Sequence, residues 1–248
     1  MTPPRIHTET DLDTGLAALA AADGRFAALL AAAGRPPLRR RSDGFAALAA
    51  IIVAQQLSTA SANAIWGRLE AAFDPLDPDA IVRARAARLA RLGLSAPKIR
   101  ALKAIARAVK NGDLALTALG ELAAEEAHAA LTAVHGIGPW TADIYLLSCL
   151  GHADAWPAGD LALQEAARVA FALESRPTAK EMVALAEAWR PWRAVAARIL
   201  WTYYRIATAA AKTAKDRAPR RDSGAKRRAR LAPSRKRRRT GTKTPRKR

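Results

Sequence analysis

Cysteine is almost absent from the 248-residue sequence, in which Cys149 is the only one. A single cysteine excludes a disulfide within the chain, and it cannot make a four-cysteine zinc or iron–sulfur site. Cys149 lies in the apolar run IYLLSCL, where we expect a buried side chain. The four histidines show no metal-ligand spacing. We therefore expect no cofactor and no catalytic metal.

Long apolar runs are also missing. No stretch reaches the roughly 18 residues that a membrane span needs. The N-terminal segment MTPPRIHTETDLD lacks the charged-then-apolar order of a secretory signal. We expect a cytoplasmic protein without a membrane partner, associated with the nucleoid if its source is bacterial. Half of the residues are hydrophobic, so the chain can bury a core.

The sequence also lacks the patterns typical of β-strands. No five-residue stretch alternates convincingly between apolar and polar side chains. Helical periodicity instead predicts an all-α fold, an irregular two-lobed bundle of about ten helices. Asp43 and Asp77-Pro78 are typical helix starts, and Asn111-Gly112 is a typical helix end. The expected helices are 12–33, 43–56, 59–73, 78–92, 96–111, 121–134, 140–150, 160–172, 178–189 and 192–210.

Acidic residues are scarce at the C-terminal end. Residues 212–248 carry 18 Lys or Arg against Asp216 and Asp222, which places +16 of the chain's +19 there. Such a segment repels itself and has few apolar side chains to bury, so we expect a disordered basic tail after a helical domain of residues 1–211. Nonspecific contact with nucleic-acid phosphates is its natural use. A solubility or targeting role is the alternative.

Glycine and proline gather in LTAVHGIGPWTADIYLL, residues 131–147, where only about five residues join two amphipathic helices. Gly136 and Gly138 permit backbone angles closed to other residues, and Pro139 suits a first helical turn. The free N–H groups that begin the second helix suit a phosphate. By itself, GxG between helices also fits a purely structural turn.

The longer pattern closely resembles the helix-hairpin-helix of the DNA glycosylase superfamily: apolar residues, G-[IV]-G, one residue, then [KW]-T-A. In that superfamily a Gly/Pro-rich loop and an aspartate follow, as PAGD supplies with Asp160. IIVAQQLSTASANAIWGRL (51–69) and AEAWRPWRAVAARILWTYY (186–204) are similar to its alkylbase branch. The resemblance covers roughly residues 15–205. It points to the AlkA type, 3-methyladenine DNA glycosylase II, in a short form without the N-terminal β-domain.

The resemblance implies an enzyme that flips alkylated purines, 3-methyladenine first, out of double-stranded DNA and hydrolyses their N-glycosidic bond. Asp160 would be the catalytic carboxylate, stabilising oxocarbenium charge on the sugar and orienting the attacking water. Trp140, Trp201 and Tyr145 would line the base pocket, where indole faces attract a cationic base. The enzyme would act as a monomer and leave an abasic site.

The resemblance also implies DNA contacts at two turns. The residue that fills the gap left by the flipped nucleotide is open between Gln56 and Leu57. Backbone carbonyls of the hairpin would hold a structural cation that bridges to a phosphate; these belong to Thr132, Val134 and Ile137. The implied DNA-binding residues are Gln55, Gln56, Leu57, Ser58, His135, Gly136, Ile137, Gly138 and Thr141.

Structural interpretations of the same residues stay open. Asp160 also suits the N-cap of the helix LALQEAARVAF. Asp143 and Asp154 are its nearby competitors as the catalytic carboxylate. Trp189 and Trp192 fit core packing better than a pocket. Lys98, Arg100 and Lys103 are expected on a solvated helix face or, less often, at a phosphate.

Two other functions are alternatives to the alkylpurine DNA glycosylase that the resemblance implies. One is a non-catalytic DNA-binding protein that uses the hairpin and the basic tail. The other is a glycosylase-lyase that acts on oxidised bases and cuts the strand through a Schiff base, which requires a lysine amine at position 140. An indole cannot form a Schiff base, so Trp140 predicts a monofunctional enzyme.

Overall fold

The computed structural model describes residues 4–217, and all of the secondary structure in that range is helical apart from one isolated bridge between Arg5 and His152. This confirms the predicted all-α class. Of these, residues 4–208 form one compact unit, and residues 209–217 belong to a second. The helices are α1 (Glu9–Ala22), α2 (Gly24–Ala33), α3 (Gly44–Ala54), α4 (Thr59–Ala72), α5 (Pro78–Arg83), α6 (Ala86–Arg91), α7 (Ala96–Asn111), α8 (Ala124–Thr132), α9 (Pro139–Tyr145), the π-helix η1 (Leu146–Leu150), α10 (Leu161–Ala170), α11 (Ala179–Ala186), the 3₁₀-helix η2 (Glu187–Trp189) and α12 (Arg193–Arg217).

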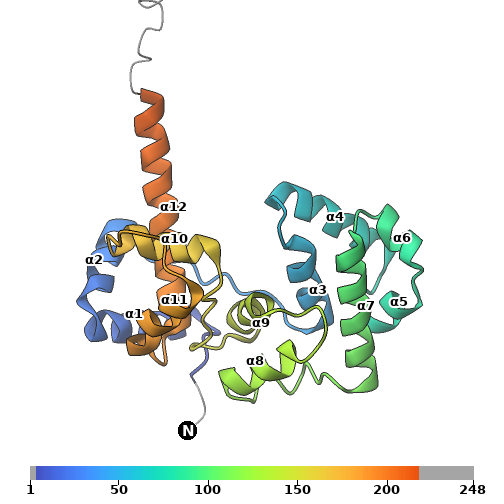
Figure 1. The fold of residues 1–248 in the computed structure, drawn as a ribbon. Helices are drawn as coiled ribbons and strands as arrows, with labels where there is room; N and C mark the ends of the chain where they lie inside the picture. The colour runs from blue at the N-terminus through green and yellow to red at the C-terminus, as the bar shows by residue number, and fades with distance from the viewer. Residues whose placement is uncertain (1–3, 218–248) are drawn as a thin grey trace, which may run out of the picture. The chain divides into compact units, whose positions relative to one another are not determined.

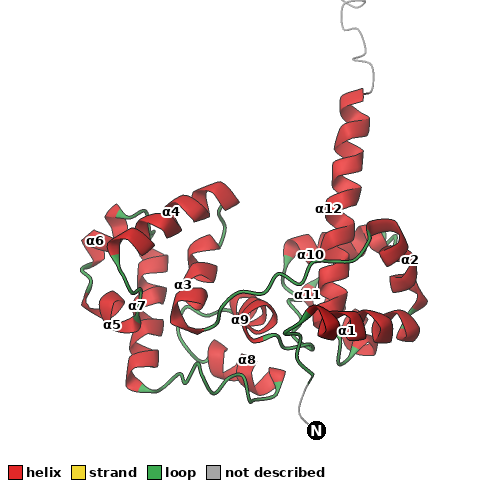
Figure 2. Cartoon of the chain, turned by 180° about the vertical axis from the view of Figure 1, so that it is seen from behind, coloured by secondary structure: helices red, strands yellow, loops and turns green. Residues whose placement is uncertain are grey.

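Within residues 4–208 the helices gather into two groups, as Figures 1 and 2 show. Helices α3 to α7 make the first group. The second contains α1, α2, α10, α11 and the first part of α12. The α8–α9 hairpin joins them along the chain, and α9 packs against both α3 and α8. The expected two-lobed bundle is therefore present, with the hairpin between its lobes.

Local capping signals set most helix ends where the sequence predicts them. Ser58 caps α4 by accepting from the Ser61 N–H (3.2 Å). Asp77 caps α5 by accepting from the Ala80 N–H (2.6 Å), with Pro78 at the first helical position. Gly112 ends α7 in the left-handed conformation. These ends follow from a few neighbouring residues, which is why sequence reasoning finds them.

Two predicted helices are broken in the structure. The expected helix 12–33 divides into α1 and α2 because Asp23 is extended and its carboxylate accepts from the Arg25 N–H, starting a new helix. The expected helix 78–92 divides at Ala84 and Arg85, which are both extended. Twelve α-helices therefore occupy the described range, where about ten were expected.

The last helix is longer than predicted. Helix α12 continues to Arg217, past the expected end at residue 210. Its final stretch, ATAAAKTAKDR, consists mostly of strong helix formers, which let the helix propagate. Residues 212–217 are thus helical, which corrects their assignment to a disordered tail. The rest of that predicted tail, 218–248, lies outside the described residues. No helix within 4–217 has the length and apolar character to cross a bilayer.

The core of the second group is aromatic. Trp189 is 1% exposed and packs edge-on against Phe26 and Trp156. Its Nε1–H donates to Asp23 (3.1 Å), so the indole also fixes the break between α1 and α2. Trp192 lies against Gly15 of α1. The core interpretation of both tryptophans is confirmed, and so is the burial of Cys149.

Gly136 is required by the hairpin for two reasons. Its φ is +96°, in the left-handed region that favours glycine, and a Cβ there would lie 2.5 Å from the Ala101 Cβ of α7. Gly138 differs, because its φ is −84° and nothing lies within 4 Å of a Cβ built on it. Of the two glycines, only Gly136 therefore uses the backbone freedom that glycine permits.

We expect Gly136→Ala to lower the free energy of unfolding by about 1–3 kcal/mol, because the added methyl must displace α7 backbone while the strained φ remains. Gly138→Ala adds the same methyl into open space and serves as the matched control. Urea denaturation of both variants measures the difference. Equal stability of the two would contradict the packing described here.

Candidate active site

Asp160 is held in place by a rigid turn that follows η1. Its N–H donates to the Pro157 carbonyl (2.9 Å). The Gln164 side chain reaches back from α10 to donate to the Ala158 carbonyl (2.9 Å). Trp156 anchors the same turn by donating to the Met182 carbonyl (3.0 Å). The PAGD segment therefore has little freedom, and it presents Asp160 at the N-cap of α10.

The Asp160 carboxylate receives three N–H donors from three parts of the chain. Trp140 Nε1 donates to Oδ2 at 2.7 Å, and Trp201 Nε1 donates to Oδ1 at 3.3 Å. The backbone N–H of Leu163 also donates to Oδ1 at 2.8 Å. Three of the four residues that the sequence assigns to catalysis and base binding, Asp160, Trp140 and Trp201, thus meet at one carboxylate. A carboxylate has about four lone-pair positions, so one remains for a water or a sugar.

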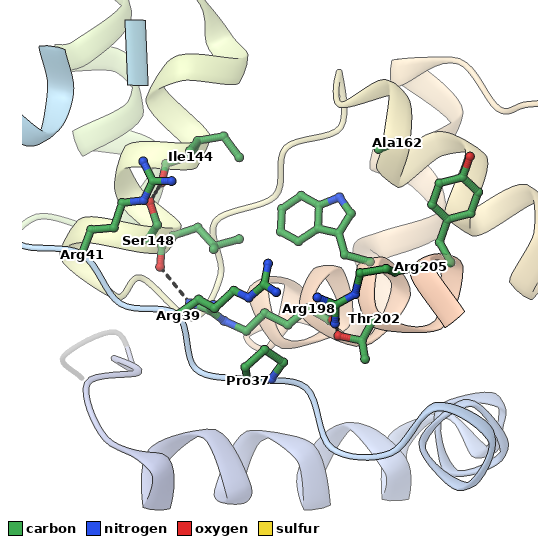
Figure 3. Close-up of a pocket in the computed structure, with 12 residues that line it drawn as sticks. Pro37, Arg39, Arg41, Ile144, Ser148, Ala162, Arg198, Thr202 and Arg205 are labelled. Atoms are coloured by element: carbon green, nitrogen blue, oxygen red, sulfur yellow. Dashed lines mark hydrogen bonds between the residues drawn. The ribbon is translucent and has the colours of Figure 1, made fainter. Parts of the chain in front are cut away.

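Trp201 also lines a pocket of about 360 Å³, whose lining does not include Asp160 or Trp140. Figure 3 shows this pocket with Ile144 and Ser148 on one side and Thr202 and Arg205 of α12 on the other. Ligand pockets in proteins begin at about 300 Å³, so the volume suits a single small ring system. The pocket is lined by Pro37, Arg39, Arg41, Ile144, Leu147, Ser148, Ala162, Arg198, Trp201, Thr202, Tyr204 and Arg205.

Tyr145 does not belong to the pocket, which corrects its predicted role. The side chain is fully buried, and its hydroxyl accepts a hydrogen bond from the Gly44 N–H (2.9 Å). It supplies the first bond of α3, where Asp43 occupies the N-cap position without a side-chain capping bond. Burial raises the pKa of the Tyr145 phenol well above its ordinary value. Tyr145 therefore joins the hairpin to α3.

Thr141 is also a structural residue rather than a surface contact. It is 1% exposed, and its hydroxyl accepts from Gln55 Nε2 at 2.7 Å. The Thr141 hydroxyl is therefore already engaged within the protein, and the contact of this residue with DNA stays a prediction. Because Gln55 lies just after α3 and Thr141 in α9, the bond fixes the turn after α3 relative to the hairpin.

The turn after α3 presents two side chains to solvent. Gln56 is exposed and takes the left-handed conformation (φ +55°), which is unusual for a residue with a side chain. Leu57 is one of the few large apolar side chains left exposed, at 39%. Strained backbone of this kind concentrates at functional positions. Both candidates for filling the DNA gap thus stand at the tip of the turn.

The hairpin exposes its backbone and buries one side chain. His135, Gly136 and Gly138 are exposed, whereas Ile137 is 4% exposed and anchors the turn in the core. The first N–H groups of α9 have no partner within the helix, as at any helix start. Of the three carbonyls expected to hold a cation, that of Val134 already accepts the Ile137 N–H (3.1 Å). The cation site stays a prediction.

The two competing aspartates lie in a separate pocket of about 230 Å³. Asp154 is paired with Arg193 (2.7 Å) and Arg190, so its charge is already neutralised. Asp143 is mostly buried, and this burial raises its pKa to about 8. His128 lies 3.6 Å from it, and burial lowers the pKa of that imidazole, so two neutral groups meet there. Neither aspartate contacts Trp140 or Trp201.

Several basic residues have roles that sequence reasoning missed. Lys98 donates to the carbonyls of Val53 (2.7 Å) and Gln55 (2.9 Å), which closes the end of α3, and Lys103 donates to the Val82 carbonyl at the end of α5. Neither is a solvated side chain. The arginines that line the pocket next to Trp201 were also missed by sequence reasoning. They come from a loop and a helix that lie far apart in the sequence, and no local sequence pattern connects them.

Comparison with known proteins identifies the family. The family described as HhH-GPD superfamily base excision DNA repair protein matches residues 49–191, which is more than half of the chain and includes the hairpin and Asp160. The chain belongs to this superfamily. The match begins within α3 and ends before α12, so the HhH-GPD region covers Trp140 but not Trp201.

Individual HhH-GPD relatives agree. DNA-3-methyladenine glycosylase 1 of Schizosaccharomyces pombe is 32% identical over 160 residues, covering 63% of this chain and 70% of that protein. The solved structure of the fission-yeast 3-methyladenine DNA glycosylase in complex with abasic DNA is 29% identical with a TM-score of 0.69, over 76% of this chain and 95% of that one. A Bacillus halodurans DNA-3-methyladenine glycosidase is 28% identical with a TM-score of 0.71, over 84% and 95%.

Other curated relatives are much longer than the matched region. The chain covers only 33% to 40% of the length of three relatives from Bacillus subtilis and Mycobacterium tuberculosis. Membership in the superfamily rests on the shared region. The activity of the whole protein is therefore argued below from its site.

The buried Asp143 makes stability depend on pH. Its ordinary pKa is 3.8 and its folded pKa is about 8, so between these values the folded state holds a proton that the unfolded state has lost. The free energy of unfolding should then fall as pH rises from about 4 to 8 and level off above. We expect Asp143→Asn, which cannot ionise, to flatten this dependence.

Urea denaturation at several pH values between about 5 and 8 measures the change. Asp113→Asn, an exposed position after α7, is the matched control and should keep the wild-type slope. Base release by Asp143→Asn should stay within about twofold of wild type, because the side chain lies in a different pocket from Asp160. An unchanged slope in Asp143→Asn would show that this carboxyl is ionised in the folded state.

Proposed function

We propose that this protein is a monofunctional DNA glycosylase that flips alkylated purines out of double-stranded DNA and hydrolyses their N-glycosidic bond. The observation that carries the proposal is the Asp160 carboxylate, held between the Trp140 and Trp201 indoles beside a pocket. Family membership supports the same conclusion. A DNA-binding domain without catalysis has no need of an oriented carboxylate next to a pocket.

The proposed reaction uses the pocket for the base and Asp160 for the sugar. The flipped base enters beside Trp201, which brings the glycosidic bond toward the carboxylate on the edge of the same indole. As the bond breaks, positive charge develops on the sugar, and Asp160 stabilises it. Asp160 then orients or deprotonates the water that attacks C1′. The three N–H donors keep the carboxylate in one orientation throughout, so no reorganisation is required.

The proposed enzyme cleaves no strand. Strand cleavage in this superfamily needs an amine that attacks the sugar, and position 140 carries an indole whose N–H is already donated to Asp160. No lysine lines the pocket beside it. The product is therefore an intact abasic site.

The proposed partner is double-stranded DNA containing alkylated bases, bound by one protein molecule. The exposed backbone of His135, Gly136 and Gly138 suits a phosphate, and Gln56 and Leu57 lie where they can enter the gap. The names of the fission-yeast and Bacillus relatives favour 3-methyladenine as a substrate. The proposed location is the cytoplasm, on the nucleoid if the source is bacterial.

Asp160→Asn tests the catalytic assignment. Asparagine caps a helix as well as aspartate does, and its side-chain oxygen can still accept an indole N–H, so the variant should fold and bind DNA. It cannot stabilise the sugar cation by charge. We expect the single-turnover release of 3-methyladenine from alkylated DNA to fall by about 10²–10³-fold, with the dissociation constant for the same DNA within about threefold.

Asp154→Asn is the control for a neighbouring carboxylate in the other pocket, and it should retain release. If Asp160→Asn released the base as fast as the wild-type protein, Asp160 would not be the catalytic carboxylate. Absence of release by the wild-type protein, with DNA binding intact, would favour the non-catalytic rival. Borohydride treatment during the reaction should trap no covalent protein–DNA adduct, and a trapped adduct would favour the lyase.

Leu57→Ala and Gln56→Ala test which side chain fills the gap. Burying a leucine side chain in the base stack contributes about 1.5–3 kcal/mol, so we expect Leu57→Ala to slow single-turnover release roughly tenfold or more. Gln56→Ala should have a smaller effect, because a polar side chain gains less from burial. Val183→Ala, which truncates an equally exposed apolar residue on α11, is the control. If Gln56→Ala lost more base release than Leu57→Ala, Gln56 would be the residue that fills the gap.

A further inference from the structure

Lys98 occupies a position where its own helix does not favour a cation. It lies in the first turn of α7, and the N-terminal end of a helix carries partial positive charge. The side chain is half-buried, and this burial lowers the pKa of its ammonium. No carboxylate pairs with it in the described part of the chain. The stabilisation of this charge must therefore come from another element.

The end of α3 supplies that stabilisation. Lys98 Nζ donates to the carbonyls of Val53 (2.7 Å) and Gln55 (2.9 Å). The C-terminal end of a helix carries partial negative charge, and the last turn of α3 contains no basic residue of its own. Helix α7 packs against α3, as Figure 1 shows, and this packing brings the ammonium to the two carbonyls. Lys98 thus neutralises the end of a helix to which it does not belong.

The Gln55 carbonyl belongs to the peptide group that joins Gln55 to Gln56. Gln56 is the residue with the left-handed backbone, at a φ of +55°. A peptide group is rigid, so a contact that fixes its carbonyl restricts both the ψ of Gln55 and the φ of Gln56. A left-handed residue with a side chain is strained and persists only where its surroundings hold it. The hydrogen bond from Lys98 is one of the contacts that hold it.

Other bonds fix the same turn, residues 55–58. The Gln55 side chain donates to Thr141 of α9 (2.7 Å), and the Leu57 N–H donates to the Ala54 carbonyl (3.3 Å). Ser58 caps α4 at the far end of the turn. The two exposed side chains, those of Gln56 and Leu57, therefore stand on a backbone that is held on both sides.

Helix α7 also contacts the hairpin. A Cβ added to Gly136 would lie 2.5 Å from the Cβ of Ala101, so hairpin and helix are in close contact there. Residues 98 and 101 are three apart and share one face of α7. That face meets the turn after α3 through Lys98 and the hairpin through Ala101. One helix therefore sets the position of the turn relative to the hairpin.

We propose that Lys98 is a positioning residue for base flipping, which holds the turn of residues 55–58 in the conformation from which Leu57 or Gln56 enters the DNA gap. This rests on the proposed function and adds to it a residue that acts through the turn rather than on DNA. An ammonium has three N–H donors, and the Val53 and Gln55 carbonyls take two of them. A turn that is held in advance does not have to be ordered when the base leaves the stack.

Lys98→Met tests the inference in the full-length protein. Methionine keeps an unbranched side chain but offers no donor to the two carbonyls. We expect single-turnover release of 3-methyladenine from alkylated DNA to fall about 10–30-fold, as for the loss of a hydrogen bond from a charged group. The dissociation constant for undamaged DNA should stay within about threefold, because the phosphate contacts are unchanged. Lys98→Arg keeps the charge and the donors and should recover part of the release.

Lys103→Met is the matched control. Lys103 lies on the same helix, is likewise half-buried, and donates to the Val82 carbonyl at the end of α5 (3.0 Å). The variant loses the same kind of hydrogen bond at the end of a different helix. Release should therefore stay within about twofold of wild type. Urea denaturation of both variants establishes that each is folded under the assay conditions.

Fluorescence measures the action of the turn without catalysis. A duplex carries 2-aminopurine, whose emission depends on its stacking, beside a tetrahydrofuran abasic analogue that has no base to release. Entry of a side chain into this gap changes the stacking. We expect Lys103→Met to give the wild-type change in emission at saturating protein, and Lys98→Met to give less than about half of it.

Leu57→Ala combined with Lys98→Met separates action through the turn from an independent role. If Lys98 acts through the turn, the double variant should release the base about as fast as the slower single variant, whereas independent losses would multiply. Multiplied losses, or wild-type release by Lys98→Met, would overturn the inference and leave the proposed function standing. So would weaker DNA binding with a flatter salt dependence in Lys98→Met, which would make Lys98 a phosphate contact. A wild-type protein that releases no base would overturn the proposed function, and the 2-aminopurine emission would then decide whether Lys98 positions the turn.

Discussion

Three segments of the chain converge on the Asp160 carboxylate, and the arrangement of the site depends on that convergence. Trp140 begins the second helix of the hairpin, Asp160 begins α10, and Trp201 lies on α12. The two indole N–H groups and the Leu163 N–H hold the carboxylate from different directions. A shift of the hairpin relative to α12 would break at least one of these bonds. The hairpin and the proposed catalytic carboxylate are therefore linked through Trp140.

The capping and catalytic interpretations of Asp160 do not exclude each other. A helix N-cap needs one oxygen to accept a backbone N–H, and Asp160 provides it to Leu163. The other oxygen accepts from Trp140, and the carboxylate as a whole remains partly exposed. Capping fixes the side-chain rotamer, which is what a group that must act on a sugar at a defined position requires. Here the structural role supplies the orientation that the proposed chemistry uses.

Sequence reasoning located the residues that lie in contiguous motifs. Trp140 and Asp160 belong to one short stretch whose order and spacing identify it. Tyr145 was misassigned because a motif places a residue on a helix but does not show which neighbouring element that side chain will contact. The Tyr145 hydroxyl meets the start of α3 instead of the pocket. The break between α1 and α2 depends on the capping hydrogen bond of the Asp23 side chain. That bond competes with continuation of α1 as a single helix. Arg198 meets the Leu38 carbonyl only because the loop before α3 passes α12, and no sequence periodicity records such a contact.

The position of the arginines alters how selectivity in this pocket should be understood. An indole face attracts a cationic base by about 0.5–2 kcal/mol, but nearby guanidinium groups oppose the same charge at short range. For a cationic alkylated purine the two effects cancel in part, so charge alone would select it only weakly in binding. A pocket that gains its stabilisation in the transition state rather than in binding raises the rate without holding normal bases tightly. In the proposed enzyme the protection of normal DNA then rests largely on the flipping step, which exposes most readily a base whose pairing is already weakened.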